Sequence, residues 1–344
     1  MSMLKLYTDT MCLIPENRKF IFPLLLDLCY INNVNLLTKY TIVNDIKDCD
    51  IAVVPIDIAR YDRTKSQEKL SAFIKKANKY DKKVWIYSGG DFGRTIRNTN
   101  NVYTFRLGGF ESKLDDKTFI FPSFISDPFR YLNTGFVPLK KKDKPQVGFV
   151  GHANNSFVKR SKEIIIFLKY NMKRWLGKIQ TDYQSFFPSS LKRFKLLKKL
   201  ENSDLISTDF IYRNSYRAGV QNDEDLRRTT TEFFENIVRN PYTFCMRGAG
   251  NFSVRFYETL AMGRIPLIVD TDFRFPLAGQ IEWEKHCLIC KEDSIVDTLI
   301  DFHQKISSDD FELMQRNNRD LWVKHLEREA YFLNIYSIFK TNIQ

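Results

Sequence analysis

Residues 253 to 272 read SVRFYETLAMGRIPLIVDTD, and this stretch decides the fold. The spacing of its apolar residues predicts an amphipathic helix over Val254–Met262. Gly263 and Pro266 break that helix, and the apolar run Ile265–Val269 predicts a buried strand. A helix that passes through a tight turn into a buried strand is typical of a parallel α/β sheet.

The loop before this helix carries the residues that suggest a ligand. An apolar strand is predicted over Tyr242–Met246, and RGAGNFS follows it. Small residues from Gly248 onward let a ligand approach the backbone, and Asn251 or Ser253 can cap the helix. The free N–H groups of a helix start favour an anion such as a pyrophosphate. Arg247, at the start of the loop, can bind its phosphate oxygens.

Two charged residues lie one turn apart on the predicted helix. Arg255 is placed to bind phosphate from the same side as Arg247, and Glu258 shares its helix face. A carboxylate there can accept hydrogen bonds from a ribose diol, so the spacing suits a nucleotide lying along the helix. Spacing alone equally allows an ordinary surface ion pair between Arg255 and Glu258.

The rest of the chain alternates strands and helices in two halves. Buried strands are expected at 4–7, 51–55, 84–87, 102–106 and 119–121, then at 147–150, 205–212, 242–246, 265–269 and 287–289. A charged segment with a proline, residues 139–146, reads as a linker between the halves. We therefore predict an α/β protein with two Rossmann-like domains facing across a cleft, a GT-B arrangement. The expected divisions are residues 1–140, residues 141–310 and a C-terminal helix within 311–344 that packs back on the domains.

Composition excludes several classes of protein. The chain has 344 residues, 43% of them hydrophobic, and a net charge of +12. The start, MSMLKLYTDTMCLI, lacks the pattern of a signal peptide, so we expect a cytoplasmic protein, peripheral at the inner face of a membrane. The positive charge suits nucleotide phosphates, lipid-phosphate carriers or an acidic membrane surface. We expect no nucleic-acid partner, because no helix-turn-helix, RNP or finger motif is present.

The six cysteines, including a lone C-x-x-C at 287–290, are typical of buried thiols in a reducing compartment.

One extended segment resembles a known family. FCMRGAGNFSVRFYETLAMGRIPLIV is similar to the nucleotide-binding half of the exostosin family, glycosyltransferase family 47. IEWEKHCLIC, IKDCDIAVVPI and YSGGDFGR are similar to further segments of that family, so the resemblance spans roughly residues 40 to 290. Gly90 stands where the family commonly has His, Thr259 where it has Ala and Arg264 where it has Cys. The matching positions are Phe244, Cys245, Arg247, Gly248, Ser253, Arg255, Glu258, Leu260, Gly263, Ile265 and Pro266.

The resemblance implies a GT-B fold and inverting sugar transfer from a nucleotide sugar, commonly a UDP-sugar, without an obligatory metal. Carried over by position, Glu258 would hold the ribose, and Arg255 and Arg247 would face the diphosphate. The acceptor implied is a glycan or a lipid-linked oligosaccharide in surface polysaccharide synthesis.

Inverting transfer needs a general base on the acceptor hydroxyl, opposite the leaving diphosphate. Asp91 is the first candidate, because it follows two glycines at a strand end and matches the Asp of the family's loop. His152, just past the strand that opens the second half, is the next. Asp57, which follows the strand at 51–55, is the third. Each of these has a plain structural alternative as a turn, loop or capping residue.

Other readings remain open at this stage. Asp270-Thr271-Asp272 ends the strand at 265–269, and two such carboxylates hold a divalent metal in GT-A glycosyltransferases. We expect a strand-end loop without a metal, with the metal-dependent GT-A enzyme as the alternative. A non-catalytic nucleotide- or sugar-binding module is a further alternative. A fucosyltransferase-like GT-B enzyme using a GDP-sugar is the last.

Overall fold

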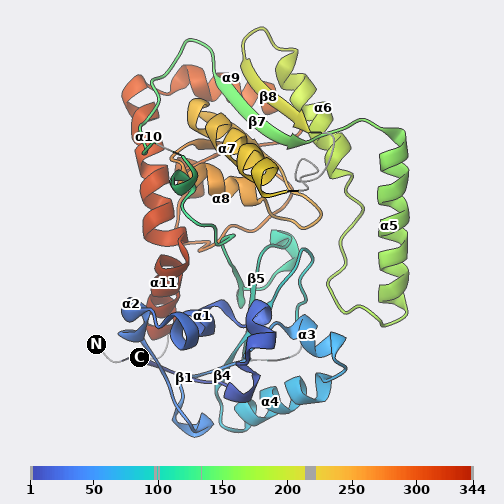
Figure 1. Cartoon of the computed structure of the whole chain (residues 1–344), viewed down its shortest axis with the longest axis vertical. Coiled ribbons are helices and arrows are strands. Elements are labelled where there is room, and N and C mark those ends of the chain that lie inside the picture. The colour runs from blue at the N-terminus through green and yellow to red at the C-terminus, as the bar shows by residue number, and fades with distance from the viewer. Residues whose placement is uncertain (1–2, 97–98, 100, 133, 214–221, 342–344) are drawn as a thin grey trace.

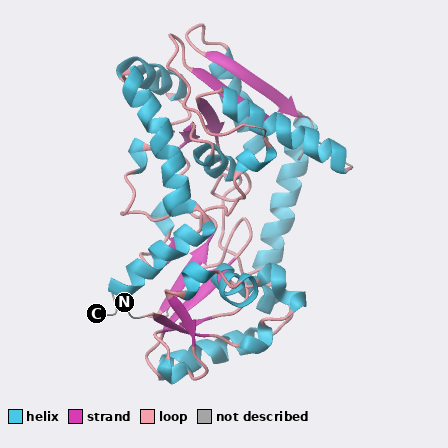
Figure 2. Cartoon of the chain, turned by 60° about the vertical axis from the view of Figure 1, so that its left-hand side comes forward, coloured by secondary structure: helices cyan, strands magenta, loops and turns pink. Residues whose placement is uncertain are grey.

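The computed structural model describes residues 3–96, 99, 101–132, 134–213 and 222–341, so the extreme ends of the expected domain ranges lie outside it. The chain forms two parallel β-sheets, each flanked by helices, one in the lower and one in the upper half of Figure 1. Figure 2 shows the two sheets as separate groups of strands along the long axis. The predicted α/β class with two Rossmann-like domains in a GT-B arrangement is confirmed.

The first sheet has the strand order β2-β1-β3-β4-β5-β6, and all its neighbours are parallel. Its central strand β3 is covered on both faces, since Ile51, Ala52 and Val53 are fully buried. A continuous apolar run is what a strand between two helical layers requires. The strands are β1 Leu4–Tyr7, β2 Tyr40–Ile42, β3 Ile51–Val53, β4 Lys83–Ser88, β5 Val102–Arg106 and β6 Thr118–Ile120.

The second sheet has the order β11-β10-β9-β7-β8, again with parallel neighbours. After β7 the chain adds β8 on one side and then returns to add β9 on the other. The order therefore reverses between β7 and β9, and in open α/β sheets ligands bind beyond the strand ends at such a reversal. The strands are β7 Gln146–His152, β8 Ser207–Arg213, β9 Tyr242–Cys245, β10 Ile265–Val269 and β11 Leu288–Cys290.

Helices cover both sheets, and the helix predicted over Val254–Met262 is observed as α8. The strand β2 was not among the expected strands. The α-helices are α1 Pro23–Leu26, α2 Val34–Leu37, α3 Ile58–Arg63, α4 Gln67–Lys79, α5 Phe157–Trp175, α6 Ser189–Glu201, α7 Asp223–Arg239, α8 Val254–Ala261, α9 Ile295–Lys305, α10 Ser308–Leu321 and α11 Arg328–Thr341. Short 3-10 turns lie at Thr10–Cys12, Pro15–Phe20, Ile46–Asp48, Glu111–Lys113, Pro128–Tyr131 and Trp283–Lys285, and π-helical turns at Asp27–Ile31 and Trp322–Leu326.

The sequence also predicts one long helix from about Glu312 to Phe339, and that prediction is wrong. The chain leaves α10 through the π-helical turn, and Glu327 then takes an extended conformation with ψ 150° before α11 begins. The break follows from packing, because the two helices belong to different cores. Phe311 of α10 is buried in the core of the second sheet, whereas Phe332 of α11 is buried in the core of the first.

Polar contacts tie the two domains together beside the strand ends. Arg274, after β10, binds both carboxylate oxygens of Glu111 at 2.7 and 2.8 Å. Phe110 and Phe273 form an antiparallel bridge between the same two segments. Because these contacts hold the loops after both sheets together, a site there is built from both domains. Within the part of the chain that the structure describes, no helix has the length and apolar character needed to cross a membrane.

Candidate functional site

The candidate site lies where the order of the second sheet reverses. His152 ends β7, and Arg213 of β8 is its neighbour in register. β9 ends at Cys245 and leads to Arg247, and α8 begins beyond the intervening loop. The sequence thus delivers charged residues from three adjacent strand ends to one edge of the sheet.

Arg255, in the first turn of α8, points back toward β7. Its Nη2 donates a 2.6 Å hydrogen bond to the carbonyl of Val150, and its guanidinium lies 4.4 Å from the ring centre of Phe149. Its Nε is buried and has no hydrogen-bond partner. Burial lowers the pKa of Arg255, a sign that its charge is poorly compensated.

Arg247 is almost wholly buried. Its Nη2 donates to Oε1 of Gln184 at 2.8 Å and to the carbonyl of Ala249 at 2.7 Å, while its Nε has no partner. The guanidinium lies over the ring of Phe187 at 4.6 Å. Burial lowers the pKa of Arg247 to about 10, so it stays charged at neutral pH.

Arg193 of α6 completes the cluster, and the sequence analysis missed it. Its Nη1 donates to the carbonyl of His152 at 2.7 Å and its Nη2 to the carbonyl of Arg247 at 3.3 Å, so it bridges the ends of β7 and β9. Burial first, and the nearby charge of Arg255 second, lower its pKa to about 10. The only signal in the sequence is an arginine within the lysine run at 192–199.

These three arginines share an unusual state. In each one Nε is buried without a partner, and among the described residues none of the three forms a salt bridge. Buried charge without a counterion is unfavourable unless an anion joins it. The cluster of Arg193, Arg247 and Arg255, called the arginine cluster below, therefore has the chemistry of an anion site.

Glu258 lies one turn beyond Arg255 on α8 and is only partly exposed. Burial raises the pKa of its carboxyl to about 7, and the charge of Arg255 offsets only part of that effect. No salt bridge joins the two side chains, so the ordinary ion pair allowed by their spacing does not form among the described residues. The Glu258 carboxylate also takes no hydrogen bond from any described residue, which leaves it open to a polar ligand.

The loop residues before α8 act differently from the expectation that Asn251 or Ser253 caps this helix. Ser253 occupies the N-cap position but makes no side-chain hydrogen bond there. Asn251 is fully buried, and its Nδ2 donates instead to the carbonyls of Gly109, Thr271 and Asp272. Because neither side chain caps α8, its first N–H groups are left without a side-chain partner.

The two glycines of this loop have different surroundings. A Cβ at Gly250 would collide with the backbone carbonyl of Asp91, so the space that a side chain would need is filled by the first domain. Nothing lies within 4 Å of a Cβ built at Gly248, so open space remains there. Gly250 thus brings the loop after β4 and the loop after β9 into contact.

The three candidate bases occupy different environments. Asp91 is exposed, in the loop that meets Gly250. His152 is partly buried, with Nδ1 3.1 Å from Oγ of Ser190. Asp57 caps α3 through Ala59 and also accepts a hydrogen bond from the backbone N–H of Gly89, so it supports the loop that carries Asp91. Burial raises the pKa of Asp57.

The Asp270-Thr271-Asp272 segment joins the two domains. Both carboxylate oxygens of Asp272 accept hydrogen bonds from Ser112, at 3.1 and 2.5 Å. Asp270 accepts one from the backbone N–H of Asp272, which has a positive φ of 57°. Among the described residues no group of three or more His, Cys, Asp or Glu side chains is arranged to hold a metal ion.

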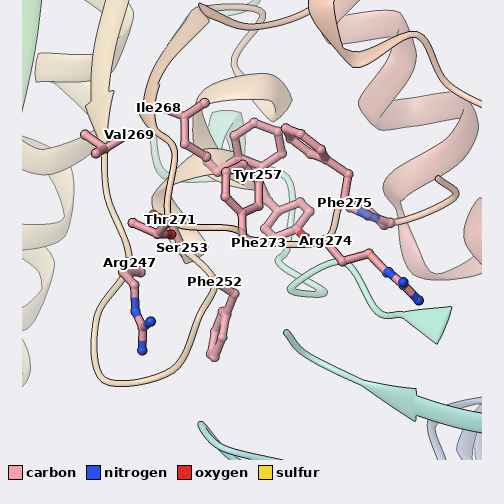
Figure 3. Close-up of a pocket in the computed structure, with 12 residues that line it drawn as sticks. Arg247, Phe252, Ser253, Tyr257, Ile268, Val269, Thr271, Phe273, Arg274 and Phe275 are labelled. Carbon is pink, nitrogen blue, oxygen red and sulfur yellow. The ribbon is translucent and has the colours of Figure 1, made fainter. Parts of the chain in front are cut away.

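Two cavities flank the arginine cluster. One is small, about 20 Å³, and lies between the start of α8 and the loop after β10. Ser253, Tyr257, Phe273 and Phe275 line it, and the guanidinium of Arg247 points away from these aromatic rings (Figure 3). The other, with about 210 Å³, lies between α5 and the loops after β4 and β9. It is lined by Phe92, Tyr170, Phe187 and Ala249, among others.

Comparisons with known proteins give distant structural similarity only. No protein-family model matches the chain, and no curated protein matches it. The chain is similar to TarM at 9% identity over 83% of this chain and 54% of TarM (TM-score 0.35), so it spans about half of TarM's length. It is similar to a glycosyltransferase from Rickettsia africae ESF-5 at 11% identity over 99% and 100% (TM-score 0.40). It is also similar to sucrose-phosphate synthase from Thermosynechococcus elongatus at 11% identity over 99% of each chain (TM-score 0.34). Similarity at this level assigns no function, and the exostosin resemblance stays a prediction.

Proposed function

We propose that this chain is a glycosyltransferase that moves a sugar from a nucleotide sugar, a UDP-sugar, to a glycan acceptor. One observation carries the proposal: among the described residues the arginine cluster forms no salt bridge, and the Glu258 carboxylate beside it accepts no hydrogen bond. Three cations without a salt bridge in the described part of the chain, and a carboxylate one helical turn from Arg255, match a diphosphate joined to a ribose. Their position at the strand-order reversal of a parallel sheet supports a nucleotide ligand.

We propose one orientation for the donor at this edge of the sheet. Its diphosphate would lie on the arginine cluster and the free N–H groups at the start of α8, where the helix dipole favours an anion. Its ribose hydroxyls would donate to the Glu258 carboxylate.

The reaction we propose is a single displacement with inversion. The acceptor hydroxyl oxygen attacks the anomeric carbon, the bond from that carbon to the diphosphate oxygen breaks, and the nucleoside diphosphate leaves with the electron pair. The arginine cluster would stabilise the charge that develops on the leaving oxygen, as preorganised cations do in a site that excludes water. We propose no metal for this step, because the cluster already carries positive charge.

Asp91 is the general base that we favour for the acceptor proton. It is exposed, and its backbone carbonyl meets the donor loop at Gly250, which supports a position for its carboxylate on the acceptor side of the candidate donor site. Asp57 would act as a positioning residue through Gly89, and His152 would bind near the diphosphate. The cavity beside α5 is the proposed acceptor subsite, since its aromatic lining suits the apolar faces of a sugar or a lipid-linked glycan.

Ligand-dependent stability tests the proposal. A ligand that binds only the folded state at about 100 times its Kd stabilises by about 2.7 kcal/mol. We expect the melting temperature to rise with UDP more than with GDP, ADP or CDP, and the rise to persist in EDTA. A rise only with manganese would assign the diphosphate to a metal. No rise with any nucleotide would refute the donor site.

A further inference from the structure

The helix α5, Phe157–Trp175, stands at the edge of the molecule and runs from the second domain alongside the first (Figure 1). Its contact with the first domain includes the rings of Tyr170 and Phe92, whose centres are 4.9 Å apart. Glu163, Phe167, Tyr170 and Arg174 lie on its inward face and line the larger cavity. Their spacing of four, three and four residues is that of one helix face.

The outward face of α5 is a second apolar stripe. Ile164, Ile165, Leu168, Met172 and Trp175 share helical spacing, and their exposed fractions run from 36% to 85%. Five large apolar side chains on one exposed face are more than a surface normally leaves in water. This face, called the α5 stripe below, has the character of a docking surface.

Basic residues border the α5 stripe on both sides. Lys162, Lys169 and Lys173 are exposed along one edge, and Arg160 is exposed along the other. Within the described part of the chain none of these four forms a salt bridge. The helix has one acidic residue, Glu163, and that residue faces the cavity rather than the surface.

We propose that the α5 stripe docks the protein on an anionic lipid surface. An apolar face bordered by Lys and Arg is the pattern of a helix that lies in a membrane interface, with apolar side chains among the acyl chains and cations at the headgroups. Trp175, 85% exposed at the end of the helix, has the amphipathic ring that favours this interface. A second copy of this chain fits less well, because it would bring the same basic residues to the same face. This proposal is independent of the proposed transferase reaction.

The tryptophans make the docking measurable. Trp85, Trp283 and Trp322 are at most 4% exposed, so Trp175 is the one tryptophan of four that can enter a bilayer from the surface. We expect the full chain to float with vesicles of phosphatidylcholine and phosphatidylserine, and much less with phosphatidylcholine alone. Binding should shift the fluorescence to shorter wavelength, and brominated lipid should quench it. Trp175→Phe should still bind but lose both optical signals.

Matched variants distinguish binding through the α5 stripe from a general effect of net charge. The triple variant Lys162→Glu, Lys169→Glu and Lys173→Glu should lower the partition coefficient at least about 100-fold, from about fivefold for each lysine lost near the surface. Lys75→Glu, Lys140→Glu and Lys195→Glu remove the same charge at exposed sites elsewhere and should retain most of the binding. Ile165→Ser with Leu168→Ser and Met172→Ser should abolish the fluorescence shift.

Three outcomes would overturn the proposal. One is a folded wild-type chain that does not bind anionic vesicles. Another is binding that both lysine variants lose equally, which would make it a property of net charge. The third is a wild-type dimer in solution that the serine variant dissociates while vesicles leave it intact. That result would assign the α5 stripe to a second copy of the chain.

Discussion

Arg255 is the residue on which the proposed chemistry depends most. Replacing it with alanine removes one of three cations from the leaving-group side, and loss of one preorganised group of this kind lowers kcat about 100- to 1000-fold. We expect that loss in Arg255→Ala, and a smaller one in Arg255→Lys, which keeps the charge but not the bond to Val150. Steady-state transfer kinetics with the full chain measure both.

The control for this experiment is Arg228→Ala, since Arg228 is an exposed arginine of α7. It should transfer at the wild-type rate. Because Arg255 also packs on Phe149, circular dichroism and a thermal melt must show that the alanine variant is folded. A folded Arg255→Ala that transfers normally would remove Arg255 from the diphosphate.

Glu258 makes stability depend on pH in a predictable direction. An unfolded Glu titrates near pH 4.3, whereas burial raises the folded-state pKa of Glu258 to about 7. Between these values the folded state binds a proton that the unfolded state lacks, so stability falls as pH rises. The full effect is about 3 to 4 kcal/mol. Glu258→Gln lacks this titration and should gain stability relative to wild type between pH 5 and pH 8.

Urea unfolding at both pH values measures this difference, with the exposed Glu284→Gln as control. An equal pH response in wild type and Glu258→Gln would contradict the buried carboxylate. The same titration bears on the donor, because a protonated carboxyl is a poorer acceptor for ribose hydroxyls. UDP affinity should weaken below about pH 7 in wild type, and by more than in Glu258→Gln, which reports the titration of the nucleotide alone.

Site residues could be read from the sequence only where they lie close together along the chain. Arg247, Arg255 and Glu258 fall within one strand–loop–helix unit, so local spacing was enough to connect them. Arg193 reaches the same point from α6 by bridging two carbonyls, a contact that depends on how β7 and β9 pair. No periodicity in a lysine-rich helix encodes that contact.

At the level of elements, the segment after α5 is fastened to the first domain by one carboxylate. Asp182 accepts from Nη1 of Arg106 at 2.6 Å and from the N–H and Oγ1 of Thr95 at 3.0 and 2.8 Å. Burial by itself raises the pKa of Asp182, but these hydrogen bonds outweigh it and the net pKa is lowered. Its stabilising contribution is therefore present above about pH 4 and is lost as pH falls further.

Asp182→Asn should destabilise the protein by about 3 kcal/mol, because the buried Arg106 then lacks its counterion. It should also open residues 176–188 to proteases in the folded state. The measurements are urea unfolding and limited proteolysis, with Asp320→Asn as the control, whose pair with Lys324 is exposed. Equal unfolding midpoints for Asp182→Asn and wild type would show that this contact does not fasten the segment.

Element types followed from the sequence where the pattern was strong and local. The strands β1, β5 and β10 have the predicted bounds. The strand β10 is wholly apolar, whereas β1 and β5 are mainly apolar or aromatic and include one charged residue each. The segment from 312 to 339 is apolar enough for one helix, yet its two halves pack in different cores, and tertiary packing overrides local propensity there. The interdomain contact of Asp270-Thr271-Asp272 likewise depends on the fold, because its partner Ser112 lies 160 residues earlier in the chain.

For the molecule as a whole, the last helix completes the first domain. Tyr331, Phe332, Ile335, Tyr336 and Phe339 of α11 are buried among residues of the first sheet, although about 200 residues of chain separate them from β6. The sequence predicts a C-terminal helix that packs back on the domains, but the two alternating halves do not indicate that this helix joins the core of the first. The first core is therefore complete only when the whole chain is present.

This arrangement predicts how the molecule fails when α11 is altered. Phe332 is fully buried, and its ring packs with those of Phe22 and Phe121. Phe332→Ala should destabilise the protein by about 3 to 5 kcal/mol, through lost burial and the cavity left behind. Leu313→Ala, at an exposed position of α10, is the matched control and should change stability little.

A chain ended after Leu326 should lose protease resistance in residues 4–120 first, while residues 146–290 stay resistant, with fragments identified by mass spectrometry. A truncated chain whose first domain resists proteolysis as well as wild type would show that the first core closes without α11.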